Sequence, residues 1–143
     1  MIIQGIAGSV FLGICSITDI LNRKIYLNVC LGFLAAGILI NILDGQTAAS
    51  YFIMSVLPGA LVMFIALATK ERVGIGDGFI VITTGVIYGL KNVINICGMT
   101  FLILSVYCVI MLLIGKMKLS DKIPFSPFLM IGNMIFIMYG GLV

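Results

Sequence analysis

The sequence has no histidine and very few charged residues. Its 143 residues include eight Lys or Arg and five Asp or Glu, so charged residues make up 9% of the chain, against roughly 25% in ordinary globular domains. Hydrophobic residues make up 62%, and the mean hydropathy is +1.31. This composition excludes a soluble globular domain and predicts a polytopic protein embedded in a lipid bilayer.

Other absences limit the chemistry. Without histidine, the chain cannot build a histidine-based nucleophilic triad or a metal site with histidine ligands. It also has no Cys-x-x-Cys pair and no basic patch with interleaved aromatics, so neither a zinc site nor a nucleic-acid partner is predicted. No cofactor is expected. We expect the four cysteines to be free packing residues: Cys15, Cys30, Cys97 and Cys108.

Apolar runs of about the length needed to cross a bilayer are separated by the few charges. They predict an all-α bundle of about six transmembrane helices in a single domain over residues 1–143. The expected helices are residues 2–18, 25–43, 48–69, 76–90, 93–115 and 123–143.

The charges in the connections predict the orientation. Seven of the eight basic residues fall between the first and second, third and fourth, or fifth and sixth helices: Arg23, Lys24, Lys70, Arg72, Lys116, Lys118 and Lys122. Lys91 lies on the other side, as does Asp44. By the positive-inside rule the first side is cytoplasmic and both termini face outward.

Small residues recur at spacings that let membrane helices approach one another. The expected packing stripes are Gly5, Ser9 and Gly13 on the first helix, Gly32 and Ala36 on the second, and Gly85 and Gly89 on the fourth. Such stripes support a compact bundle and no particular activity.

The five acidic residues separate into two groups in this topology. Three lie in connections and are interpreted as solvated loop charges: Asp44, Glu71 and Asp121. The other two, Asp19 and Asp77, lie at the cytoplasmic ends of the first and fourth predicted helices. A carboxylate at a membrane helix costs free energy and is a functional hypothesis by default.

Helical spacing places small or weakly polar residues on the same face as each aspartate. These residues are Gly8, Cys15 and Ser16 for Asp19, and Val81, Thr84, Gly85 and Tyr88 for Asp77. Two such faces can bring the carboxylates together around a water-accessible notch.

Each carboxylate also has a structural interpretation. Asp19 can pair with Arg23 one helical turn later, and Asp77 can be a first-turn acid favoured by the helix dipole. Spacing alone leaves both interpretations open. Three glycines lie close to Asp77 in sequence: Gly74, Gly76 and Gly78. They favour the functional interpretation, because glycines remove side chains around the carboxylate and permit backbone geometry closed to other residues.

Two neighbouring carboxylates that share a proton titrate as a coupled pair. One can act as a general base for a water molecule while the other acts as a general acid. With no histidine, this arrangement points to aspartic peptide hydrolysis.

The segment Gly74-Ile75-Gly76-Asp77 resembles the Gly-x-Gly-Asp motif of intramembrane aspartic proteases. Asp19, followed by Arg23-Lys24-Ile25 and a second helix, resembles the first catalytic segment of the type IV prepilin peptidases. The run 123–129, Ile-Pro-Phe-Ser-Pro-Phe-Leu, is similar to the proline-bearing segment that opens the last helix of that family. The small size resembles the peptidase-only forms associated with Tad/Flp pili.

The resemblance implies a function and its residues. Asp19 and Asp77 would be the catalytic pair, Gly74, Gly76 and Gly78 would shape the site, and Pro124 and Pro127 would support it. The implied substrate is a pilin or pseudopilin precursor, cut on the cytoplasmic side. The N-terminal region with paired cysteines that larger members carry, associated with methylation of the new N-terminus, is not expected here.

Two departures from the family pattern stand in the sequence. Gly78-Phe79-Ile80 replaces a continuation that usually includes lysine, and Ile25-Tyr26-Leu27-Asn28 replaces Ile-Pro-Asn. Two alternatives stay open: a small membrane transport or binding component that uses the acids for ion coupling, and an inactive scaffold for pilus assembly. The first would place a carboxylate nearer mid-membrane or show inverted repeats.

Overall fold

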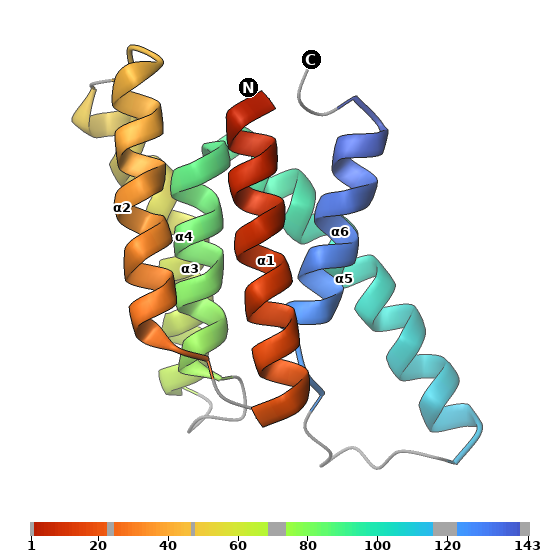
Figure 1. The fold of residues 1–143 in the computed structure, drawn as a ribbon. Coiled ribbons are helices and arrows are strands. Elements are labelled where there is room, and N and C mark those ends of the chain that lie inside the picture. Colours follow the sequence, from red (N-terminus) through yellow and green to blue (C-terminus); the bar gives the residue numbers. More distant parts are fainter. Residues whose placement is uncertain (1, 23–24, 47, 69–73, 116–122, 141–143) are drawn as a thin grey trace.

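A computed structural model of the chain describes residues 2–22, 25–46, 48–68, 74–115 and 123–140. Within these residues the backbone forms six helices (Figure 1). They are α1 (Ile2–Asn22), α2 (Leu27–Leu43), α3 (Ala49–Ala68), α4 (Ile75–Tyr88), α5 (Leu90–Leu113) and α6 (Ser126–Met138). The prediction of an all-helical bundle is confirmed.

Three of the helices, α1, α3 and α5, are long and apolar enough to cross a membrane. The other three are shorter apolar helices of 17, 14 and 13 residues. At about 1.5 Å per residue, α4 extends about 21 Å, less than the roughly 30 Å of a bilayer's hydrocarbon core. The ends of α4 therefore cannot both reach the membrane surfaces if it runs straight across.

The distribution of polarity is that of a membrane bundle. Large apolar side chains are exposed along the outside, for example Leu21, Phe64 and Leu102. Among the residues that the structure describes, ten polar or charged side chains are buried instead: Gln4, Ser16, Asp19, Asn41, Ser55, Thr83, Thr84, Thr100, Ser126 and Asn133. Lipid tails solvate apolar side chains but cannot hydrogen-bond, so polar groups are placed inside. The chain is a membrane protein with several apolar helices.

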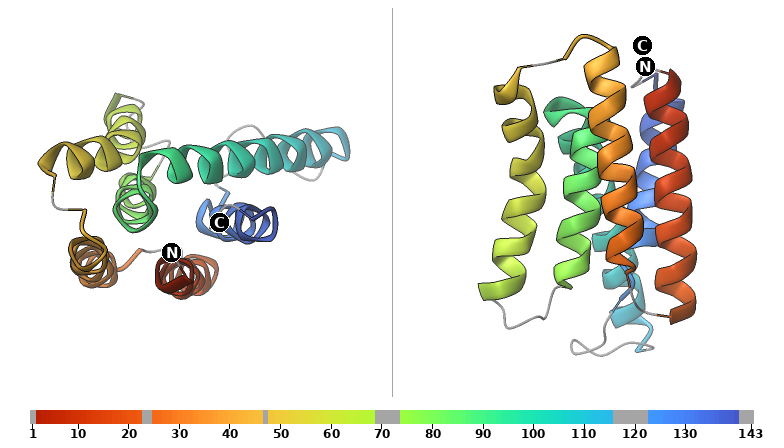
Figure 2. Two further views of the ribbon diagram at one scale, coloured as in Figure 1. Left: turned by 90° about the horizontal axis from the view of Figure 1, so that it is seen from above. Right: turned by 60° about the vertical axis from the view of Figure 1, so that its left-hand side comes forward.

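Helix α4 occupies the centre of the bundle (Figure 2). Nine of its 14 residues are buried, and it packs against α1, α2, α3 and α5, most extensively against α3. Close approach depends on glycine. A Cβ on Gly85 would collide with the backbone carbonyl oxygen of Ser55 on α3, and one on Gly37 of α2 would lie 2.9 Å from a side-chain atom of Ile87.

The predicted packing stripes are only partly correct. An added Cβ on Gly13 or Gly32 would meet nothing within 4 Å, while Gly8 lies directly against the ring of Tyr88. Gly89 is not a packing position within a helix, because its φ of +81° forms the turn between α4 and α5. Spacing identifies residues on one face, but not the face that a neighbouring helix covers.

Helix α6 is shorter than the predicted 123–143. It begins at Ser126, where proline occupies the first turn, and ends before Gly140, which has a φ of +76°. Proline is compatible with a first helical turn and disrupts the interior. The apolar run in the sequence is therefore longer than the helix itself.

Candidate active site

Asp19 lies in the last turns of α1 and is only 8% exposed. The residues predicted to share its face, Gly8, Cys15 and Ser16, are buried with it. Its carboxylate oxygen Oδ2 accepts a hydrogen bond from the backbone N–H of Ser126, at 3.3 Å. The carboxylate thus points into the bundle, toward the beginning of α6. Arg23, its alternative partner, lies outside the described residues.

Asp77 lies in the first turn of α4, near the same end of the bundle. Its backbone N–H donates to the carbonyl of Gly74 at 3.0 Å, which closes the turn that starts the helix. Gly74 is the N-cap and supplies no side-chain cap. The face predicted for Asp77 is buried along its length, from Val81 to Tyr88. Asp77 also occupies the first-turn position that the alternative interpretation, a carboxylate favoured by the helix dipole, requires.

The structure brings the two aspartates together. Helices α1 and α4 are in contact, and the carboxylates of Asp19 and Asp77 are close enough to interact electrostatically. Two carboxylates from helices distant in sequence thus lie near one end of the bundle.

The three glycines near Asp77 have three different surroundings. A Cβ on Gly76 would lie 2.7 Å from the side chain of Ile25, and one on Gly78 would lie 2.9 Å from the Cβ of Met63. A Cβ on Gly74 would lie 3.1 Å from Oδ2 of Asp77 itself. The expectation of unusual backbone geometry is wrong, because none of the three has a positive φ. Gly76 and Gly78 allow close packing, and Gly74 leaves space beside the carboxylate.

The two predicted prolines lie at the beginning of α6. Pro124 precedes the helix, and Pro127 is its second residue. Phe125, between them, caps the helix and packs its ring against Phe101 of α5, with centroids 5.9 Å apart. This segment also delivers Ser126 to Asp19, a contact over 107 positions in sequence. Sequence analysis did not single out Ser126, and its place between two prolines was the only available signal.

Comparison with known proteins decides the family. A model of the type IV leader peptidase family matches residues 6–115. The chain belongs to the type IV leader peptidase family. No curated protein and no solved structure gives a significant match.

Family membership makes the protein a prepilin peptidase, an aspartic hydrolase. Asp19, Asp77 and the three nearby glycines all fall inside the matched residues, whereas Pro124 and Pro127 follow them. Helix α6 of this leader peptidase follows the matched residues as well, so its contact with Asp19 is known from the tertiary structure and not from the family match.

Asp44, the other acid that the structure describes, is not part of this cluster. Asp44 lies at the opposite end, where its carboxylate accepts a hydrogen bond from Gln4 at 3.2 Å. The remaining acids and the seven basic residues of the connections lie outside the described residues: Arg23, Lys24, Lys70, Glu71, Arg72, Lys116, Lys118, Asp121 and Lys122. Among the residues that the structure describes, no three His, Cys, Asp or Glu side chains cluster as metal ligands would.

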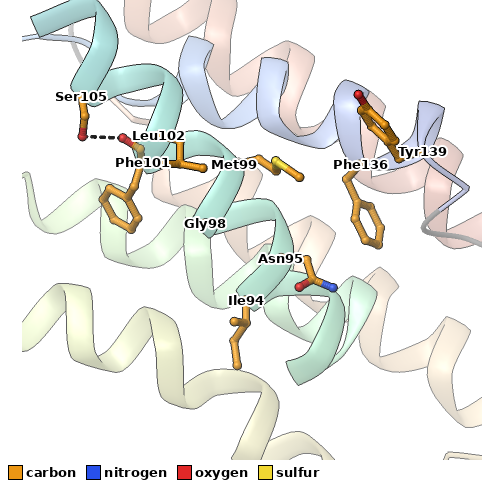
Figure 3. A pocket seen from close by; sticks show the side chains of 9 residues that line it. All are labelled: Ile94, Asn95, Gly98, Met99, Phe101, Leu102, Ser105, Phe136 and Tyr139. Carbon is orange, nitrogen blue, oxygen red and sulfur yellow. Dashed lines mark hydrogen bonds between the residues drawn. The ribbon is translucent and has the colours of Figure 1, made fainter.

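A pocket of about 790 Å³ lies between α5 and α6, and neither Asp19 nor Asp77 lines it (Figure 3). Its lining is mostly apolar and contains no carboxylate. The Ser105 hydroxyl there donates to the carbonyl of Phe101 in its own helix at 2.7 Å. The lining residues are Ile94, Asn95, Gly98, Met99, Phe101, Leu102, Ser105, Phe136 and Tyr139. This pocket lacks acid–base groups for peptide hydrolysis.

Proposed function

We propose that this leader peptidase removes the leader from a type IV prepilin-like precursor at the cytoplasmic face of the membrane. Asp19 and Asp77 are the catalytic pair in this proposal. The observation that carries the proposal is the electrostatic interaction of the two carboxylates at one end of the bundle. The two residues belong to different helices and are 58 positions apart in the sequence. Family membership supports the reaction class.

The chemistry follows from a pair that shares one proton. The ionised carboxylate accepts a proton from water as the water oxygen attacks the carbonyl carbon of the scissile amide. The protonated carboxyl group donates its proton as the carbon–nitrogen bond breaks, so that the new amino terminus leaves neutral. One acid and one amine are formed, and the pair again holds one proton.

The surroundings of the pair suit a membrane-anchored substrate. Gly74 is exposed and leaves space beside the Asp77 carboxylate. A glycine before the cut weakens the substrate helix there. The scissile amide can then extend toward the carboxylates while the apolar segment that follows it stays among lipid and the helices of the enzyme.

The proposed orientation rests on charge. Seven of the eight basic residues fall in sequence between α1 and α2, α3 and α4, or α5 and α6. The first of these connections follows the end of α1 that carries Asp19, and the second precedes the start of α4 that carries Asp77. The positive-inside rule then makes this end cytoplasmic. The beginning of α1 and the end of α6 lie together at the other end (Figure 1), as two outward-facing termini require.

The test is cleavage of a prepilin co-expressed in membranes with the wild-type enzyme or with Asp19→Asn, Asp77→Asn or Asp44→Asn. Asp44 is a matched control, because it is also an aspartate at a helix end but lies at the opposite end. We expect the wild type and Asp44→Asn to shift the precursor to the mature mobility, while the other two variants accumulate in the membrane without cleaving. Cleavage by Asp19→Asn or Asp77→Asn would refute the assignment.

A further inference from the structure

The first turn of α6 has few backbone N–H groups available, and one of them is directed at Asp19. Pro127 has no N–H. The N–H groups of Phe128 and Leu129 both donate to the carbonyl of Phe125, at 3.1 Å each. The N–H of Ser126 donates to Asp19 Oδ2. The proline thus removes a neighbouring donor, and the helix start presents Ser126 to the carboxylate.

The side-chain hydroxyl of Ser126, beside Asp19, is buried without a hydrogen-bond partner in the described part of the chain. Ser126 is 0% exposed, and its Oγ has no hydrogen-bond partner among the residues that the structure describes. Several other fully buried hydroxyls of the bundle donate within their own helix, as Ser55 does to Tyr51 at 2.7 Å and Thr84 to Ile80 at 2.8 Å. A buried hydroxyl without a partner is costly, so its retention beside a carboxylate indicates a use.

The Ser126 hydroxyl belongs to the residue whose backbone N–H already binds Asp19. Its Oγ is separated from the N–H that already binds Asp19 by only two carbon atoms, so rotation about one side-chain bond moves it relative to the same carboxylate. An ionised carboxylate can accept about four hydrogen bonds, and the N–H bond at 3.3 Å is slightly longer than the usual range. Asp19 therefore has capacity for a second donor.

We propose that Ser126 is a positioning residue of the active site: its backbone N–H holds Asp19, and its buried hydroxyl, unpartnered among the described residues, turns toward the same carboxylate and adds a second hydrogen bond during the reaction. This inference rests on the proposed function, because it gives Ser126 a role only if Asp19 takes part in the reaction. With Oδ2 held from the α6 side, the other carboxylate oxygen keeps one orientation toward Asp77 and the reacting water. The beginning of α6 thereby becomes part of the catalytic apparatus.

The test compares Ser126→Ala with Ser55→Ala in the purified full-length enzyme, using a prepilin as substrate. Both changes remove one hydroxyl from a fully buried serine, but Ser55 belongs to α3 and bonds toward the opposite end of the bundle. We expect Ser126→Ala to lower kcat about tenfold, the effect of a hydrogen bond to a charged group, and to leave KM unchanged. Ser55→Ala should leave kcat near the wild-type value.

Ser126→Thr retains the hydroxyl and is expected to restore most of the kcat lost in Ser126→Ala. A kcat of Ser126→Ala equal to that of the wild type would overturn the positioning role while leaving the proposed function intact. So would a loss shared equally by Ser55→Ala, which would reflect packing alone. If Asp19→Asn cleaves normally in the same assay, the proposed function is wrong and the inference fails with it.

Discussion

Both ends of the bundle gather buried polar side chains, but the two groups differ in how their hydrogen bonds are satisfied. At the end opposite the aspartates, Asn41 is fully buried and donates to the carbonyls of Gly37 and Val86, at 2.8 and 2.6 Å. Its carbonyl oxygen accepts from Gln4 and Tyr51, each at 3.2 Å. One side chain therefore links α1, α2, α3 and α4.

At the proposed cytoplasmic end the groups are less completely paired. Asp19 accepts one backbone N–H from Ser126, and the Ser126 hydroxyl has no partner within the described residues. The two carboxylates interact with each other across α1 and α4. A saturated network resists change, whereas carboxylates with unused hydrogen-bonding capacity can bind water and exchange protons. The network around Asn41 is therefore expected to serve stability, whereas the two aspartates are proposed to serve the chemistry.

The largest expected effect is at the carboxylates. Asp19→Asn and Asp77→Asn should each lower kcat about a thousandfold, within the range for loss of a general acid or base. The double variant should be no slower than the slower single variant, because residues that act as one unit are not additive. Single-turnover cleavage of a prepilin measures all three rates. Multiplicative losses would show that the two aspartates act independently.

A smaller loss is expected from Gly78→Ala at the same end. The added Cβ would lie 2.9 Å from the Cβ and 3.2 Å from the Cα of Met63, so α4 must move away from α3 and carry Asp77 with it. Displacement of a catalytic group should lower kcat about tenfold. Gly13→Ala is the matched control, because its Cβ would meet nothing within 4 Å. Equal rates for the two variants would contradict the positioning of Asp77 by this contact.

At the end opposite the aspartates, Asn41→Leu should affect stability instead of catalysis. It leaves the Val86 carbonyl and the side chains of Gln4 and Tyr51 without this partner, at a cost of about 1–3 kcal/mol for a buried polar group. A lower thermal midpoint in detergent is expected, with kcat per folded enzyme unchanged. A selective fall in kcat would show that the two ends are coupled.

The smallest effect is expected from Tyr51→Phe. This change removes one donor to Asn41, whose carbonyl oxygen still accepts from Gln4. We expect a loss of stability of about 0.5–1 kcal/mol and unchanged cleavage, measured by thermal unfolding and by the prepilin assay. A loss as large as that of Asn41→Leu would mean that Tyr51, and not Asn41, holds the network together.

Much of the architecture could be predicted from sequence because hydropathy and helical period are local properties. The apolar runs indicated six helices, and the scarcity of charge isolated Asp19 and Asp77 as candidates. Helix ends were less predictable. Gly140 has a positive φ just after the end of α6, yet the sequence continues past it with Gly141, Leu142 and Val143, so composition does not mark the helix end.

The sequence by itself determined the membrane class, the all-helical fold and the two aspartates as the candidate pair. These follow from which side chains lipid tolerates and from residues spaced within one helix. Only the tertiary structure decided that Gly76 and Gly78 serve packing, that Asn41 joins four helices, and that Ser126 lies against Asp19. Those contacts depend on how helices distant in sequence approach one another, which no local periodicity specifies.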